Sequence, residues 1–185
     1  MGEQHKKHSR REHLNDFHLN VAGEYVYDGA LYACQSSEEK QHRIKRAVWG
    51  MAAILIVAVI AGGCIPAPGM QNCFYVLLPY LGEFLGAASV IWALAKLGMD
   101  WSAVREYNYQ KSVAVLPVRT TVTAVFSLLG IVCELIFFFV NDHAGQTFFT
   151  LLYVLLKLTA LLSALVLRAE IMQAEWDKLP KKDNF

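Results

Sequence analysis

Four apolar stretches joined by polar connections constrain this chain more than any other feature of its sequence. They cover residues 46–65, 74–96, 118–140 and 146–168, and each has about the 20 residues that an α-helix needs to cross a bilayer. The mean hydropathy of the chain is only mildly positive because polar tails and a central loop dilute these stretches. The sequence therefore predicts an all-α integral membrane protein with four transmembrane helices in an antiparallel bundle.

The basic residues predict how these helices are oriented. All but one of the 17 Lys and Arg residues lie in the N-terminal segment, the central loop, the C-terminal tail or the span ends beside them. The turns at 66–72 and 141–145 contain neither residue type. Because basic loops stay in the cytoplasm, we expect both termini on the cytoplasmic side of the plasma membrane. The chain then has an N-terminal segment (1–43), a transmembrane domain (44–170) and a C-terminal tail (171–185).

Short motifs in the N-terminal segment predict local structure. Residues 25–27 and 30–32 flank an Asp-Gly pair, which is typical of a tight hairpin turn, so we expect a small hairpin over 25–32. Ser36, with Glu39 three residues later, fits a capping box that starts a helix leading into the first span. The histidines at positions 5, 8, 13 and 18 match no familiar zinc spacing. We therefore expect no metal site and no cofactor.

Two further helical segments are expected on the cytoplasmic side. Residues 100–103 fit an N-cap and a first helical turn, and Trp101, Tyr107 and Tyr109 suit a short helix in the membrane interface. After the fourth span, residues 168–176 keep a helical pattern. We expect that helix to project into the cytoplasm until Pro180.

Cys64 and Cys73 lie on either side of the first short turn, on the expected extracytoplasmic face. An oxidising compartment allows a disulfide between them. The alternative is two free cysteines in the outer leaflet, because the geometry of the turn is not fixed by sequence. No CxxC motif is present, which disfavours a thiol–disulfide oxidoreductase.

Three charged residues, Glu83, Glu134 and Lys157, fall inside the second, third and fourth spans. Each costs at least about 2.5 kcal/mol on the insertion scale, so we expect compensation by a partner. Counting about 1.5 Å per residue from the outer ends places Glu83 and Lys157 about 15 Å deep and Glu134 about 9 Å deep. Side chains lean toward the N-terminus of their helix, which brings all three to one level.

Small and polar residues recur at helical spacing along the same three spans. Gly82 and Gly86 form a small-xxx-small pair that permits close helix approach. We call the polar residues that accompany the charges the polar seam: Thr123, Ser127, Thr150 and Tyr153.

The charge cluster has a structural and a functional interpretation. Lys157 paired with a carboxylate would be a buried structural ion pair, and we expect its contact to be Glu134, with Glu83 close to both. One lysine cannot neutralise two carboxylates, so a protonated Glu is expected if all three meet. Ionisable groups in the membrane are also functional candidates by default.

Three classes of function are weighed. The first is a non-enzymatic subunit or adaptor of a membrane complex. The second is a small proton-coupled carrier or channel, oligomeric, that titrates Glu83 or Glu134. An enzyme is disfavoured because no catalytic dyad, ligand cluster or cofactor motif is present. The expected partners are the lipid bilayer and a protein at the N-terminal segment, with a second copy of the chain as a further candidate. The net charge of +1 argues against nucleic acid.

Overall fold

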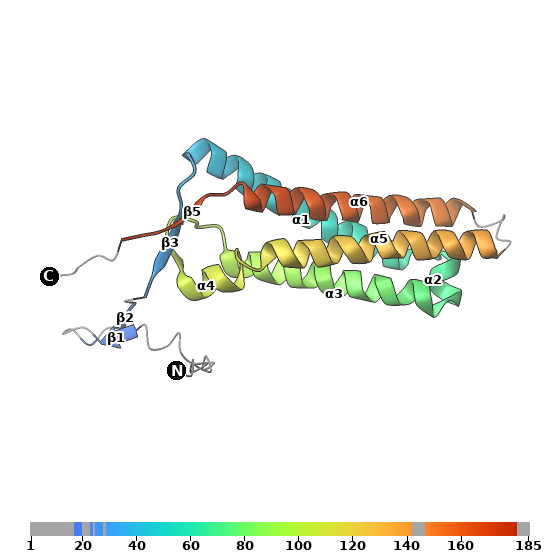
Figure 1. Cartoon of the computed structure of the whole chain (residues 1–185), viewed down its shortest axis with the longest axis horizontal. Helices are drawn as coiled ribbons and strands as arrows, with labels where there is room; N and C mark the ends of the chain where they lie inside the picture. The colour runs from blue at the N-terminus through green and yellow to red at the C-terminus, as the bar shows by residue number, and fades with distance from the viewer. Residues whose placement is uncertain (1–16, 20–22, 24, 28, 142–146, 181–185) are drawn as a thin grey trace, which may run out of the picture.

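The computed structural model of the chain describes residues 17–19, 23, 25–27, 29–141 and 147–180. The chain is mostly helical, and its four long helices lie side by side along the longest axis of the molecule (Figure 1). Each is long and apolar enough to cross a membrane, as the sequence predicts. They are α1 (Glu38–Cys64), α3 (Phe74–Leu97), α5 (Leu116–Val140) and α6 (Thr147–Met172).

The helices pack around two different kinds of core. α6 lies between α1 and α5, and α5 lies between α3 and α6. The contacts of α1 and of the sheet end are apolar, and they include Val48, Leu94, Leu116 and Leu167. Between α3, α5 and α6 the buried positions instead include polar and charged side chains. Large apolar side chains such as Leu85 and Leu162 point outward, which suits helices surrounded by lipid.

The short helix α2 (Pro68–Asn72) connects α1 to α3 at one end of the bundle (Figure 1). Pro68 lies at its start, where the missing N–H costs nothing. Cys64 is exposed at the end of α1, and Cys73 is half-buried where α2 meets α3. Both are free cysteines. The expected disulfide is therefore not formed, and free thiols, the alternative, are what the structure contains.

A three-stranded sheet covers the opposite end of the bundle. β3 (Leu31–Cys34) is the central strand, and it pairs antiparallel with β4 (Val104–Arg105) and with β5 (Trp176–Lys178). Leu31 pairs with Arg105, and Ala33 pairs with Asp177. The sheet thus ties together three segments that are far apart in the sequence.

The predicted hairpin over 25–32 is not the pairing that forms. β2 (Tyr25–Tyr27) pairs antiparallel with β1 (Phe17–Leu19), while the second predicted strand becomes β3 of the other sheet. Asp28, in the predicted turn, lies outside the described residues, as do the histidines at 5, 8 and 13. The sequence thus predicted strands at about the positions of β2 and β3, but not the strands with which they pair.

Aromatic side chains fill the space under the sheet. Trp101 is fully buried, and its ring lies 5.5 Å from that of Trp176. Tyr109, on the short helix α4 (Glu106–Lys111), stacks on Tyr32 with a 4.3 Å centroid separation. The expected short helix in the central loop is present, but it begins at Glu106 because residues 104–105 join the sheet. Trp101 packs in the protein rather than in the membrane interface.

The ends of the helices and the loop after α3 differ from one another in their local hydrogen bonds. Asp100 accepts hydrogen bonds from the backbone N–H and the hydroxyl of Ser102, and these bonds lower the pKa of its carboxyl. Gly98 ends α3 at a φ of 69°, a conformation that favours glycine. α1 begins after Ser37 rather than Ser36, and the Ser36 hydroxyl has no hydrogen-bond partner among the described residues, so the expected capping box of Ser36 and Glu39 does not form. The helix expected to project until Pro180 ends at Met172 instead, because residues 176–178 pair with β3 as β5.

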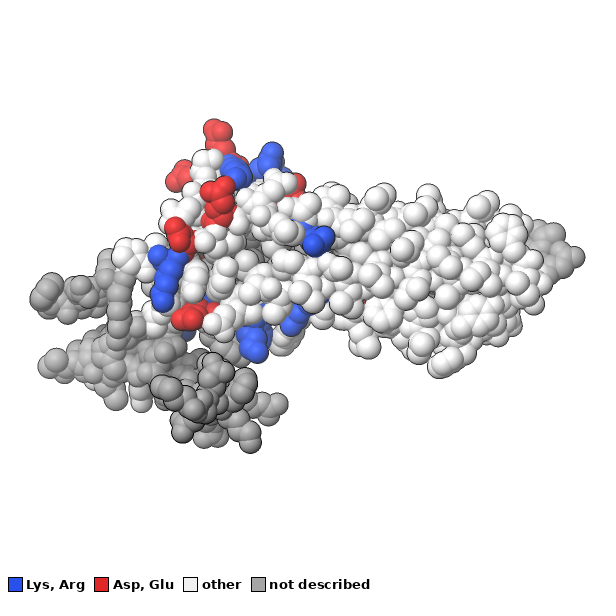
Figure 2. All heavy atoms as spheres, in the orientation of Figure 1, with Lys and Arg blue, Asp and Glu red and all other residues white. Residues whose placement is uncertain are grey.

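Charged side chains are gathered at the sheet end on the face that Figure 2 shows, and the rest of that face is uncharged. Lys40 forms an ion pair with Glu175 at 3.3 Å, and Arg43 donates to Gln173 at 3.3 Å. These contacts join the start of α1 to the residues that follow α6. On this face a charged end is therefore followed by a long uncharged surface.

Candidate functional site

Glu83 of α3 and Lys157 of α6 form an ion pair inside the bundle. The Lys157 ammonium contacts Oε2 of Glu83, and the exposed fractions of the two residues are 1% and 0%. α3 and α6 both begin at the α2 end of the bundle (Figure 1), and Glu83 and Lys157 lie at similar numbers of residues from the starts of these helices. Glu83 and Lys157 were predicted to lie at the same depth by counting residues from the outer ends of their spans, and this equal depth allows their side chains to meet.

The second oxygen of Glu83 has its own donor. Ser127 of α5 donates to Glu83 Oε1 at 2.6 Å, so each carboxylate oxygen accepts a hydrogen bond from a different helix. This arrangement matters because a buried charge is tolerated only when it is paired and hydrogen-bonded. Glu83 is therefore the point at which α3, α5 and α6 are joined.

Two aromatic rings surround the Lys157 ammonium. Its Nζ lies 4.6 Å from the ring centroid of Tyr80 and 5.0 Å from that of Tyr153. A cation over a desolvated aromatic face gains about 2 kcal/mol or more. Tyr153 belongs to the predicted polar seam, whereas Tyr80 was missed. The signal was present, because Tyr80 precedes Glu83 by three residues and helical spacing places both on one face.

Glu134 occupies a separate position toward the α2 end. Its exposed fraction is 0%, and its Oε1 accepts a hydrogen bond from the backbone N–H of Gly69 at 3.4 Å. A Cβ at position 69 would collide with the Glu134 carboxylate. Gly69 thus allows the backbone of α2 to approach the carboxylate, a contact that the helix spacing of the spans alone could not predict.

The partner of Lys157 differs from the expected one. We expected Glu134 with Glu83 nearby, and the structure pairs Lys157 with Glu83. Glu134 lies one turn beyond Gly130 on α5, and a Cβ at Gly130 would be 3.6 Å from Lys157 Cε. The lysine stem therefore passes along the same face of α5 that carries Glu134, while its ammonium reaches Glu83.

The rest of the polar seam is buried, as the sequence pattern indicates. Thr123 donates to the Arg119 carbonyl at 2.8 Å, so its hydroxyl is satisfied within α5. The Thr150 and Tyr153 hydroxyls have no hydrogen-bond partner among the described residues. Thr123, Ser127 and Tyr153 are 0% exposed, and Thr150 is 3% exposed. The seam therefore adds buried polar groups on both sides of the ion pair.

Glycine residues of α3 bring that helix close to α5. A Cβ at Gly86 would lie 2.6 Å from Thr123 Oγ1 and 3.3 Å from Thr123 Cα. A Cβ at Gly82 would lie 2.6 Å from the Phe126 ring. The small-xxx-small pair thus faces α5, and the close approach places Ser127 within reach of Glu83.

The chain matches no protein-family model, and no curated protein or solved structure is significantly similar to it. Within the described ranges, no group of three His, Cys, Asp or Glu residues is placed to hold a metal ion.

Proposed function

We propose that the chain is a non-enzymatic subunit or adaptor of a membrane complex, with its four helices in an antiparallel bundle. The observation that carries this proposal is the enclosure of the Glu83–Lys157 pair. At most 1% of the surface of either residue is exposed. Both carboxylate oxygens of Glu83 accept hydrogen bonds, one from Lys157 and one from Ser127. A pair closed in this way holds helices together, and it cannot exchange protons with solvent without a rearrangement.

The charge distribution supports an orientation with both termini and the sheet in the cytoplasm of the plasma membrane. Lys and Arg residues gather at the sheet end, and the α2 turn has none. The sheet and the segment before it are then the surface that meets a protein partner. A second copy of the chain in the membrane is the other candidate.

A small proton-coupled carrier or channel is the second candidate function. It is favoured by one specific observation: two carboxylates, Glu83 and Glu134, are fully buried, while Lys157 is the one buried lysine among the described residues. In that mechanism Glu83 would release Lys157 and take up a proton during each cycle. Glu134, nearer the α2 end, would be the entry group.

Reconstitution in proteoliposomes separates the two functions. We expect no proton flux above that of empty liposomes under a pH gradient, with Glu83→Gln and Glu134→Gln identical to wild type. Cross-linking in native membranes followed by purification should yield a complex that contains a second membrane protein. Flux that is present in the wild type and lost in either Gln variant would refute the adaptor function.

A further inference from the structure

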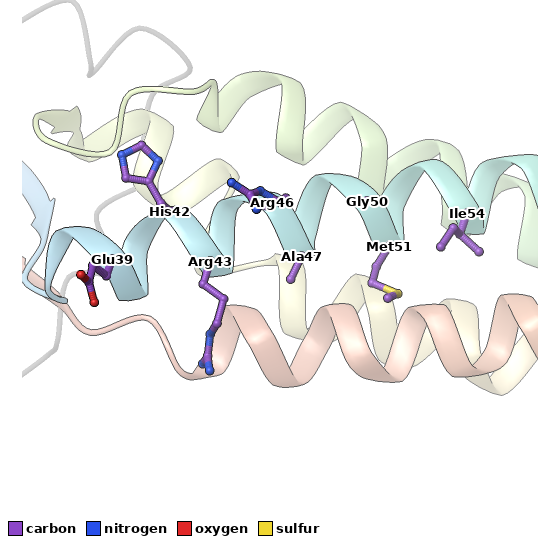
Figure 3. Close-up of a pocket in the computed structure, with 8 residues that line it drawn as sticks. All are labelled: Glu39, His42, Arg43, Arg46, Ala47, Gly50, Met51 and Ile54. Carbon is purple, nitrogen blue, oxygen red and sulfur yellow. The ribbon is translucent and has the colours of Figure 1, made fainter.

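A groove runs along the outer face of α1 at the sheet end of the bundle (Figure 3). Its volume is about 550 Å³. Its lining changes character along the helix, from ionisable residues near the start of α1 to small and apolar residues nearer the membrane centre. The lining residues are Glu39, His42, Arg43, Arg46, Ala47, Gly50, Met51 and Ile54.

The polar half of the groove carries a net charge of +1. Arg43 and Arg46 contribute two positive charges and Glu39 contributes one negative charge, with His42 counted as neutral. All four side chains are exposed, and Arg43 is held beside α6 by its hydrogen bond to Gln173. A phosphodiester carries a single negative charge, so it complements this half of the groove, and arginine is the preferred residue for phosphate oxygens.

The apolar half of the groove has room for a hydrocarbon chain. A Cβ added at Gly50 would meet nothing within 4 Å, and Ile54 is 44% exposed. The helix rises about 12 Å between Arg46 and Ile54, which carries the groove from the headgroup region into the hydrocarbon. A soluble anion would leave this half unused.

We propose that this groove binds one anionic phospholipid, with its phosphodiester on Arg43 and Arg46 and an acyl chain over Gly50. Glu39, at the outer end, lies where it accepts a hydrogen bond from a hydroxyl of the headgroup and repels a headgroup carboxylate. The preferred lipid class is therefore a hydroxylated, singly charged headgroup such as phosphatidylglycerol. This inference does not depend on the function proposed above.

Native mass spectrometry of the full chain in non-ionic detergent tests the proposal, with phosphatidylglycerol and phosphatidylcholine of identical acyl chains as probes. We expect the wild type to retain one phosphatidylglycerol more tightly than phosphatidylcholine. The double variant Arg43→Gln/Arg46→Gln should weaken phosphatidylglycerol binding roughly 30-fold, from the usual contribution of two basic residues at an anionic membrane surface. Gly50→Trp should weaken binding of both lipids, because it fills the apolar half.

Arg168→Gln is the matched control, since Arg168 is an exposed arginine of α6 outside the groove. It should keep wild-type lipid binding, and thermal unfolding should show that all the variants are folded. Equal retention of the two lipids by the wild type would overturn the proposal. An equal loss in Arg168→Gln would also overturn it, by showing general charge attraction. Complete displacement of the lipid by millimolar glycerol phosphate would show a simple anion site instead.

Discussion

Replacing Lys157 by methionine tests the ion pair most directly. Methionine keeps an unbranched apolar stem of similar length in the space beside Gly130, so the change removes mainly the ammonium. Glu83 then keeps the hydrogen bond from Ser127 and loses its ionic partner. The contacts of the ammonium with the Tyr80 and Tyr153 rings disappear as well.

The expected loss can be worked out from these contacts. Breaking a buried ion pair by removing one partner costs about 3–5 kcal/mol. Glu83 keeps its hydrogen bond from Ser127, so we take the lower end of this range and expect the free energy of unfolding to fall by about 3 kcal/mol for Lys157→Met. In Lys157→Met/Glu83→Gln no charge is left behind, and Ser127 can still bond the amide. The double variant should therefore recover about 2 kcal/mol of the loss.

Equilibrium unfolding in mixed detergent micelles measures these free energies for the wild type, the two single variants and the double variant. A second cycle with Lys157→Met and Glu134→Gln is the control. Because Glu134 bonds Gly69 and Lys157 bonds Glu83, this second cycle should be closer to additive. A coupling energy between Lys157 and Glu83 below about 0.5 kcal/mol would refute the assigned pairing. A coupling energy between Lys157 and Glu134 that exceeds the one between Lys157 and Glu83 would also refute it.

Two further predictions concern the packing of α3 and the α2 turn. Gly86→Ala should lower the free energy of unfolding by about 1–3 kcal/mol, because its Cβ would press on Thr123; Gly62→Ala, where a Cβ meets nothing within 4 Å, should not lower it. Cys64 and Cys73 should both be alkylated in unreduced protein, since both are free, and Cys64 should react with a membrane-impermeant maleimide from outside intact cells. Protection of both thiols until reduction would contradict the finding that Cys64 and Cys73 are free. Labelling of Cys64 only after lysis would contradict the orientation that places the α2 turn outside the cell.

The spans could be predicted because hydrophobic length is a local property that the bilayer thickness fixes. The strand partners could not. β3 pairs with residues 104–105 and 176–178, and no local pattern states which distant segment will lie beside a strand. The Asp-Gly pair favoured a hairpin between neighbours, whereas the pairing that forms brings the rings of Trp101 and Trp176 to 5.5 Å from each other.

The site was predictable in its members and not in its pairing. Charge inside an apolar span identified Glu83, Glu134 and Lys157, because each needs compensation wherever it lies. Depth counting gave Glu83 and Lys157 the same level, and this criterion agrees with the ion pair that forms. The backbone N–H of Gly69 could not be foreseen as a donor to Glu134, because α2 is too short to show a helical pattern.

The sheet at the end of the bundle gives the chain an order of assembly during translation. β3 is synthesised before all four spans, and its partner β5 only after the last of them. At ribosomal speed that interval is on the order of ten seconds, during which one edge of β3 has no strand beside it. The sheet is therefore completed only after all four long helices have been synthesised. A chain whose synthesis stops early differs from the finished protein because one edge of β3 is left unpaired.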